Sequence, residues 1–331
     1  MGDGDDVFRI ELCKDIRLFS WRMHRVIRIG DSEEILSGGC NMYRIPEEKK
    51  IRVIVDTDAA CEADDPFAIV HALMSPKLIV KGICAEHFAQ EGSVERSLEE
   101  IRTILRAMGL EVPAFMGQQG PVSNSQEISP AVDFIIEEAQ REDDKPLYVL
   151  CQGAITNVAM ALRKYPAIKE QMTVIWIGTH GAGDRKAAFR EFNAGNDIEA
   201  ANEMLQSGIN MWLVPSDVYT TVNVGISELE LNVAPCGEIG KHLFENLVEY
   251  NLSDAAGWTQ GESWSLGDSP AIALAINPGC GKYVETQAPL VLEDTSSAWK
   301  EDNPVIRVYT SVDSRYVLGD FFAKLRLNYG I

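Results

Sequence analysis

Residues 52–70 read RVIVDTDAACEADDPFAIV, and this stretch decides the fold. It opens on a short apolar run of strand length, which suits a strand buried on both faces of a parallel sheet. Asp56 and Asp58 follow at alternate positions, and a short loop leads to the pair Asp64-Asp65. An apolar run with helical spacing comes next. A buried strand that passes through a polar loop into a helix is the first half of a βαβ unit.

The same alternation continues along the chain and predicts an α/β fold with a Rossmann-like, mostly parallel central sheet flanked by helices. In such a sheet the active site lies at the carboxyl ends of the strands. The expected strands are Arg52–Val55, Leu78–Ala85, Leu147–Cys151, Thr173–Ile177, Met211–Val214 and Val305–Thr310. The expected helices are Asp65–Met74, Val94–Met108, Pro130–Arg141, Ile155–Lys164, Ile198–Gln206, Ile239–Tyr250 and Ser269–Ile276.

The chain of 331 residues divides into two parts of different composition. Residues 1–45 form an N-terminal extension, with a basic stretch at 19–28, and residues 46–331 form the predicted catalytic domain. The seven cysteines show no metal-binding or paired spacing, which favours free thiols in a reducing compartment. No run is long and apolar enough to span a membrane, and the acidic start does not resemble a secretory signal. We therefore expect a cytoplasmic protein.

The formal net charge of −20 limits the partners. A strongly acidic surface repels nucleic acid and anionic membranes, so neither is an expected partner. The same acidity provides carboxylates for a hard cation. We expect a small-molecule substrate and a homo-oligomer, either a dimer or a tetramer.

Five carboxylates fall within ten residues, at Asp56, Asp58, Glu62, Asp64 and Asp65. Grouped in one folded site, they need a cation, shared protons or full solvation. Oxygen ligands without histidine or cysteine favour calcium or magnesium over zinc. The alternative is that Asp64 or Asp65 only caps the following helix, which would explain one or two of the five.

The segment resembles the N-terminal aspartate motif DxDxxxDD of the inosine/uridine-preferring nucleoside hydrolases. Here the motif reads Asp56-Thr57-Asp58, five residues and then Asp64-Asp65, so its loop is two residues longer and contains Glu62. Three further segments resemble that family and occur in the family's order. They are QGAITNVA at 152–159, EFN at 191–193 and LGDSP at 266–270.

The resemblance implies a calcium-dependent hydrolase of the N-glycosidic bond of ribonucleosides or related ribosides, which releases base and ribose in nucleoside catabolism. It implies that Ca²⁺ is bound by the side chains of Asp58, Asp65 and Asp268 and by the backbone carbonyl of Gln152. Asp58 is the matching general base, with Asp65 as the adjacent alternative. The residues implied to hold the sugar hydroxyls are Asp64, Glu191 and Asn193.

The chain departs from the family pattern on the leaving-group side. Gly267 stands where the family has a histidine, and the asparagine expected after the second strand is replaced in the loop that contains His87. His87 is a candidate proton donor or contact for the 5′-hydroxyl, with a structural role as the alternative. Trp258 and Trp264 are candidates for stacking a base and equally for packing in the core. Residues 183–187, with Thr179-His180, are a candidate basic lid.

Two other functions fit part of the sequence. Asp56-Thr57-Asp58 after a strand also suits a haloacid-dehalogenase-like phosphatase, although Ala60 departs from that pattern and EFN and Asp268 are left unexplained. A calcium-dependent ribose- or nucleoside-binding protein without catalysis is the second alternative, and Gly267 is its main support.

Overall fold

The computed structural model describes residues 43–124 and 127–330, which belong to one compact unit, Gly38–Ile331. The N-terminal extension expected over residues 1–45 lies almost wholly outside the described residues, as does its basic stretch. Within the described part, no helix is long and apolar enough to cross a lipid bilayer.

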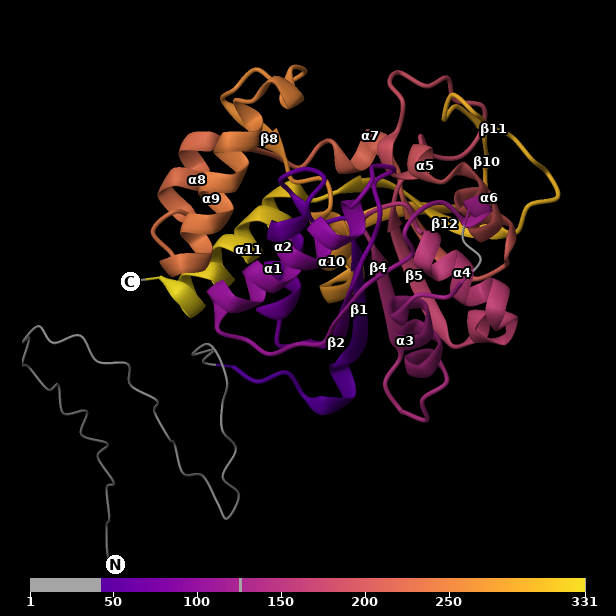
Figure 1. The fold of residues 1–331 in the computed structure, drawn as a ribbon, viewed down its shortest axis with the longest axis horizontal. Coiled ribbons are helices and arrows are strands. Elements are labelled where there is room, and N and C mark those ends of the chain that lie inside the picture. The colour runs from indigo at the N-terminus through magenta and orange to yellow at the C-terminus, as the bar shows by residue number, and fades with distance from the viewer. Residues whose placement is uncertain (1–42, 125–126, 331) are drawn as a thin grey trace, which may run out of the picture. The chain divides into compact units, whose positions relative to one another are not determined.

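The centre of the domain is an eight-stranded sheet, and all its neighbouring strands run parallel except the edge strand β9, which is antiparallel to β12 (Figure 1). In sheet order the strands are β3 (Ala114–Phe115), β2 (Leu78–Ala85), β1 (Ile51–Thr57), β4 (Leu147–Cys151), β5 (Met172–Ile177), β6 (Asn210–Val214), β12 (Val305–Val312) and β9 (Gly281–Gln287). This arrangement confirms the predicted α/β fold.

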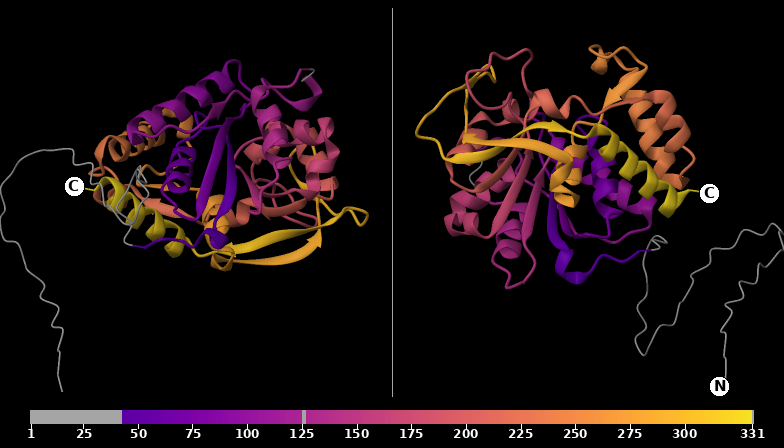
Figure 2. Two further views of the ribbon diagram at one scale, coloured as in Figure 1. Left: turned by 90° about the horizontal axis from the view of Figure 1, so that it is seen from below. Right: turned by 180° about the vertical axis from the view of Figure 1, so that it is seen from behind.

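Helices cover both faces of the sheet, as the two further views show (Figure 2). One face carries α1 (Asp65–Leu73), α2 (Ser93–Met108), α9 (Gly237–Asn251), α10 (Ser269–Ile276) and α11 (Ser314–Tyr329). The other carries α3 (Pro130–Ala139), α4 (Thr156–Lys164) and α6 (Ile198–Gln206). Each layer buries its own apolar cluster against the sheet, which therefore has a core on both sides.

Strand β1 shows why the opening sequence decides the fold. It lies between β2 and β4, and all seven of its residues are buried. Val53 and Val55 belong to the apolar cluster on one face of the sheet, and Ile54 belongs to the cluster on the other face. Both faces of the strand are covered, so its middle residues, 53–55, are continuously apolar instead of alternating.

Shorter elements connect these layers, mostly above the carboxyl edge of the sheet. Two small antiparallel sheets pair β7 (Asn223–Gly225) with β8 (Ser263–Ser265) and β10 (Leu290–Val291) with β11 (Ser297–Ala298). The short helices are α5 (Phe192–Asn196), α7 (Ser216–Tyr219) and α8 (Ile226–Asn232). The single 3-10 turns are η1 (Glu47–Lys49), η2 (Val122–Asn124), η3 (Pro166–Glu170), η4 (Asp254–Ala256) and η5 (Pro278–Cys280).

The expected strands and helices are all present, and each of their ends lies within two residues of its predicted position. The prediction missed two long elements, β9 and α11. Strand β9 has the sequence GKYVETQ and exposes most of its residues at the edge of the sheet, so it lacks the apolar run by which a buried strand is recognised. Helix α11 packs on the same face as α1, through Val317 and Phe321.

Candidate active site

Three buried aspartates meet at the carboxyl edge of the sheet. Asp64 and Asp65 stand at the start of α1, and Asp268 directly precedes α10. One carboxylate oxygen from each lies within 4.8 Å of the other two. The backbone amide of Asp268 donates to Asp64 Oδ2 at 3.2 Å, which ties the two helix starts together. Residues some 200 positions apart in the sequence therefore form one cluster, here called the acidic triad.

Helix capping does not explain the acidic triad. Asp64 and Asp268 occupy the N-cap positions of α1 and α10, yet neither side chain forms a capping hydrogen bond to its own helix. Thr57 Oγ1 donates to Asp65 Oδ1, which fixes that carboxylate from the end of β1. The triad carboxylates therefore point toward one another and not toward the backbone amides of their own helices.

Asp58 lies beside the acidic triad. The charge of Asp65 contributes to the raised pKa of its carboxyl group, and its Oδ2 has no hydrogen-bond partner although the residue is only 2% exposed. A Cβ placed on Gly153, just after β4, would lie 3.1 Å from Asp58 Cγ. The carboxyl group therefore occupies the space between the start of α1 and the end of β4.

The electrostatics of this cluster are those of crowded, buried acids. Burial, followed by the charge of neighbouring carboxylates, raises the pKa of Asp58, Asp64 and Asp268 well above the usual range for aspartate. Burial raises the pKa of Asp65 to about 6, and burial with the charge of Asp65 raises the pKa of Glu62 to about 7. At neutral pH the ionised cluster needs a counter-charge, and a hard divalent cation among oxygen ligands provides one.

A second pair of buried acids lies on the neighbouring strands. Asp56 Oδ1 accepts a hydrogen bond from Asn157 Nδ2 at 2.8 Å, and Asn157 Oδ1 accepts one from the backbone amide of Gln118 at 2.8 Å. Glu86 follows β2, is 1% exposed, and has no hydrogen-bond partner on either carboxylate oxygen. Burial and the charge of Asp56 raise its pKa well above the usual range. Sequence reasoning missed Glu86, whose position directly after a strand was the available signal.

Gln152 and Asn193 are brought together as the sequence predicts. Asn193 Nδ2 donates to the Gln152 carbonyl at 3.1 Å and to the Ile177 carbonyl at 2.9 Å. The side-chain amide of Gln152 is buried and has no hydrogen-bond partner. Gln152 directly follows Cys151, the last residue of β4, so its backbone carbonyl lies at the carboxyl edge of the sheet. Its role as a metal ligand stays a prediction.

Glu191 is fully buried and caps α5, which rules out a solvated loop at this position. Its Oε2 accepts from the backbone amides of Thr179, at 2.9 Å, and Ala194, at 2.8 Å. Its Oε1 accepts from the amide of Asn193, at 3.4 Å, and from the hydroxyl of Tyr219, at 3.0 Å. Tyr219 is a site residue that sequence reasoning missed, because no motif surrounds it.

His87 is held by bonds within the protein. Its Nε2 lies 2.8 Å from Thr156 Oγ1, which donates to Asp197 Oδ2, and its Nδ1 accepts from the amide of Ala89 at 3.4 Å. Burial lowers the pKa of His87 to about 4, so the ring is neutral at physiological pH. These contacts favour the structural alternative over the predicted role of proton donor.

The residues of the candidate lid form hydrogen bonds and an ion pair with other parts of the domain. His180 is buried, with its Nδ1 2.8 Å from Ser216 Oγ and its Nε2 2.9 Å from the Phe189 carbonyl. Arg185 forms an ion pair with Asp217, with Nη1 2.7 Å from Oδ2, and exchanges backbone hydrogen bonds with Ser297. The segment thus bridges α7 and β11.

The two tryptophans differ in their surroundings. Trp264 is 4% exposed, and its ring packs edge-on against Tyr250 at 5.5 Å between centroids. Trp258 is 61% exposed and lies 6.4 Å from Trp264 in a tilted arrangement. The charges of Glu62 and Asp64 contribute to the raised pKa of Tyr250, so this aromatic group stands near the acidic cluster. Trp264 belongs to the core, whereas Trp258 presents its ring to solvent.

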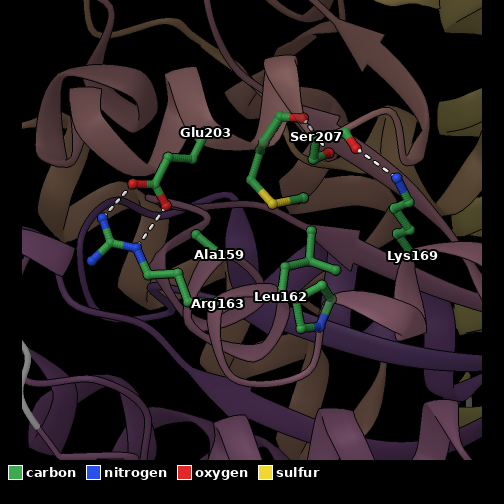
Figure 3. Close-up of a pocket in the computed structure, with 8 residues that line it drawn as sticks. Ala159, Leu162, Arg163, Lys169, Glu203 and Ser207 are labelled. Atoms are coloured by element: carbon green, nitrogen blue, oxygen red, sulfur yellow. Dashed lines mark hydrogen bonds and ion pairs between the residues drawn. The ribbon is translucent and has the colours of Figure 1, made fainter.

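A groove of about 260 Å³ between α4, η3 and α6 does not share this chemistry (Figure 3). Arg163 crosses it to Glu203 and also pairs with Glu199, while Lys169 Nζ lies 3.4 Å from the Ser207 carbonyl. The charged groups along this groove are satisfied by one another. The acidic cluster at the carboxyl edge is therefore the better candidate for an active site.

An acidic site at the carboxyl edge of a mostly parallel sheet is typical of α/β enzymes that act on small molecules. Residues 53–318 match the family described as inosine-uridine preferring nucleoside hydrolase. The chain belongs to this family of N-glycosyl hydrolases. The match covers the predicted catalytic domain and includes the four segments on which the resemblance rests.

Individual relatives agree with this assignment. The chain is similar to the pyrimidine-specific ribonucleoside hydrolase RihA of Shigella boydii, with 27% identity over 292 residues, 80% of this chain and 90% of that protein. Its fold is similar to the plant nucleoside hydrolase PpNRh1, with a TM-score of 0.71 and 19% identity over 83% of this chain and 98% of that one. It is also similar to a purine-preferring ribonucleoside hydrolase from Gardnerella vaginalis, with a TM-score of 0.67 and 22% identity over the same shares.

Proposed function

We propose that the chain is a calcium-dependent ribonucleoside hydrolase that cleaves the N-glycosidic bond and releases base and ribose. The observation that carries the proposal is the convergence of Asp64, Asp65 and Asp268 at the carboxyl edge of the sheet, with Asp58 beside them. Family membership removes the phosphatase alternative, because it accounts for EFN and Asp268 as well as for the first aspartates. The expected homo-oligomer and cytoplasmic location stay predictions.

The donor set fits calcium. It consists of buried carboxylate oxygens and a backbone carbonyl, and the side chains of Asp58 and Gln152 contain buried polar atoms without partners. Asp58, Asp65 and Asp268 would bind the ion through side chains, and Gln152 through its carbonyl. A calcium ion held there would polarise a water and bind the sugar diol. Magnesium has the same ligand chemistry in smaller, stricter geometry, so the metal must be determined by measurement.

The remaining steps are assigned to residues of this chain. Asp58 lies beside the triad, where it can accept the proton of an attacking water. Asp64, in the acidic triad, and Asn193, beside the Gln152 carbonyl, would hold sugar hydroxyls, with Glu191 supporting Asn193 through its backbone amide. The ring oxygen and anomeric carbon of the sugar become positively charged in the transition state. The dense negative charge of the cluster would stabilise that state.

The experiment is a reducing-sugar assay with uridine, cytidine, inosine and adenosine, on protein supplied with CaCl₂ and on protein stripped with a chelator. We expect ribose release from at least one nucleoside, lost on chelation and restored by calcium. Asp268→Asn is the matched variant, expected to be inactive. Ribose release that survives complete metal removal would contradict the calcium requirement.

The alternative of a binding protein without catalysis is supported by the absence of an obvious proton donor for the leaving group. Position 267 is a glycine, and the ring of His87 is hydrogen-bonded to Thr156. The same assay separates this alternative from the enzyme when ribose binding is followed by calorimetry. Calcium-dependent binding of ribose without turnover of any nucleoside would favour the binding protein. Turnover in the presence of calcium supports the hydrolase.

A further inference from the structure

Tyr219 occupies a place in the site that no motif assigns. It is the last residue of α7, which follows β6, and its ring is half-buried. Its hydroxyl donates to Glu191 Oε1 at 3.0 Å. Burial raises the pKa of the Tyr219 phenol well above its usual range, and the charges of Glu191, Asp268 and Glu62 raise it further. The phenol therefore stands between Glu191 and the acidic cluster and remains protonated.

Glu191 has no acceptor position left for a ligand. Each carboxylate oxygen has two lone pairs, and each receives two hydrogen bonds from Thr179, Ala194, Asn193 and Tyr219. A sugar hydroxyl could reach Glu191 only by displacing one of these donors. The phenolic oxygen of Tyr219, by contrast, uses its hydrogen on Glu191 and keeps lone pairs that can accept a hydrogen bond. Of these two groups, only the Tyr219 hydroxyl therefore keeps acceptor capacity for a ligand.

The ring of Tyr219 also fills the space beside Gly267. A Cβ placed on Gly267 would lie 3.1 Å from Tyr219 Cδ2 and 3.3 Å from Asp64 Oδ2. These separations are tighter than ordinary van der Waals contact, so even a methyl group at position 267 would press on the ring and the carboxylate. The large residue at 219 and the absent side chain at 267 therefore complement each other.

We propose that Tyr219 is a specificity-determining residue, which accepts a hydrogen bond from the 5′-hydroxyl of a riboside and shapes the pocket in place of a side chain at 267. The choice of hydroxyl follows from the proposed function, on which this inference rests. A riboside has three sugar hydroxyls, and the 2′,3′-diol is assigned to the metal and Asp64. The 5′-hydroxyl is left for the group beside Glu191.

The first test compares uridine with 5′-deoxyuridine, and inosine with 5′-deoxyinosine, in wild-type protein and in Tyr219→Phe. The variant keeps the ring and deletes the hydroxyl. Because one hydrogen bond is lost, we expect the wild-type preference for the 5′-hydroxyl, as a ratio of kcat/KM values, to fall by about tenfold. Tyr165→Phe, at an exposed position after α4, is the matched control and should keep the ratio. An unchanged ratio in Tyr219→Phe would overturn the inference.

The second test is a double-mutant cycle between positions 219 and 267. Gly267→Ala should lower kcat/KM about tenfold in the wild-type background, because the new methyl group displaces the ring. In a Tyr219→Ser background the same substitution should lower kcat/KM by a clearly smaller factor, because only the contact with the Asp64 carboxylate remains. Equal effects in the two backgrounds would show that the ring does not occupy the volume at 267.

These outcomes separate the inference from the proposed function. Wild-type protein that neither hydrolyses the nucleosides nor binds ribose in CaCl₂ would overturn the proposed function, and this inference with it. Wild-type protein that is active, with a 5′-hydroxyl preference that Tyr219→Phe leaves intact, would overturn the inference alone. If Tyr219→Phe is less thermally stable, its kcat/KM values for the two substrates change by the same factor. The ratio of these values therefore still reports the contact with the 5′-hydroxyl.

Discussion

The two sides of the candidate active site differ in how far they keep the family's pattern. The acidic side, formed by Asp58, Asp64, Asp65 and Asp268, keeps the four aspartates that the family resemblance implies; all four are buried, and Asp64, Asp65 and Asp268 converge. The leaving-group side has Gly267 in place of a histidine, with Tyr219 against it. The acidic residues of the site can therefore be kept while the residues opposite them change.

The difference has a structural cause. The acidic residues stand at the ends of β1, α1 and α10, which are fixed by the central sheet and its helices. The residues that distinguish the side of Gly267 belong to short elements and loops, such as Trp258 after η4 and Tyr219 in α7. Loops tolerate substitution better than the sheet on which they stand. The predictions that follow test this division, beginning with its largest expected effect.

Replacing Asp65 should have the largest effect. Asp65→Asn keeps the shape of the side chain but removes a charge from the centre of the acidic triad. We expect kcat/KM for the best nucleoside to fall by about a thousandfold or more, since metal-bound water and the diol contact are lost together. Asp133→Asn, at an exposed position of α3, is the matched control and should be silent. Activity within tenfold of wild type would show that the acidic side does not perform the chemistry.

The next largest effect is a loss of stability, which we expect for the buried Trp264 and not for the exposed Trp258. Trp264→Ala removes a buried ring that packs against Tyr250, so we expect the free energy of unfolding to fall by about 3–5 kcal/mol. Denaturant unfolding monitored by circular dichroism measures the change. Trp299→Ala, at an exposed position, serves as the control. A loss below 1 kcal/mol for Trp264→Ala would place that ring outside the core.

Trp258 should affect substrate and not stability. Its exposed ring is available to stack on a base, and stacking of this kind contributes about 1 kcal/mol. We expect Trp258→Ala to raise KM for the best nucleoside roughly five- to tenfold and to leave the affinity for free ribose, which has no base, unchanged. Steady-state kinetics and calorimetry measure the two quantities. Equal losses for both ligands would contradict stacking on the base.

The smallest expected effect is a pH dependence of the metal-free protein. Because the folded state raises the pKa of Asp56 and Asp65 to about 6 and of Glu62 to about 7, it binds protons more tightly than the unfolded chain does. Their contribution to stability is therefore present in acid and is lost as the pH rises from about 4 through 7. We expect the chelated protein to melt a few degrees higher at pH 5.5 than at pH 8, by differential scanning fluorimetry.

Calcium should reverse this trend, since it binds the ionised carboxylates. A melting temperature of chelated protein that rises steadily from pH 5.5 to 8 would show that these acids are not buried against one another. Asp65→Asn, which removes one of the coupled acids, should reduce the slope.

The sequence predicts most of the scaffold because its strong patterns are local. The strands that lie inside the sheet are apolar runs, and the passage from β1 into α1 brings Asp58 and Asp65 to its carboxyl edge, whereas Asp268, at the start of α10, was singled out by the resemblance. Strand β9 was not predicted, because an exposed edge strand needs no apolar run. The acidic side was thus predictable from spacing, resemblance and topology together.

The other side was not predictable, because its contacts join residues without a pattern. His87 bonds to Thr156, and Tyr219 bonds to Glu191 and packs against Gly267, through the packing of separate loops. For Glu86, the only feature of the sequence that indicated a place in the site was its position directly after a predicted strand. The sequence alone showed that a histidine is absent at 267, but only the structure shows the ring that fills its place.

The central claim is that a single divalent ion binds among Asp58, Asp65 and Asp268. The most direct measurement is calorimetric titration of CaCl₂ into chelator-stripped protein, wild type and Asp65→Asn, at pH 7.5. The account predicts one calcium ion per chain for wild type and an affinity at least a hundredfold weaker in the variant. Absence of calcium binding by wild type, or equal affinity in the two proteins, would contradict it.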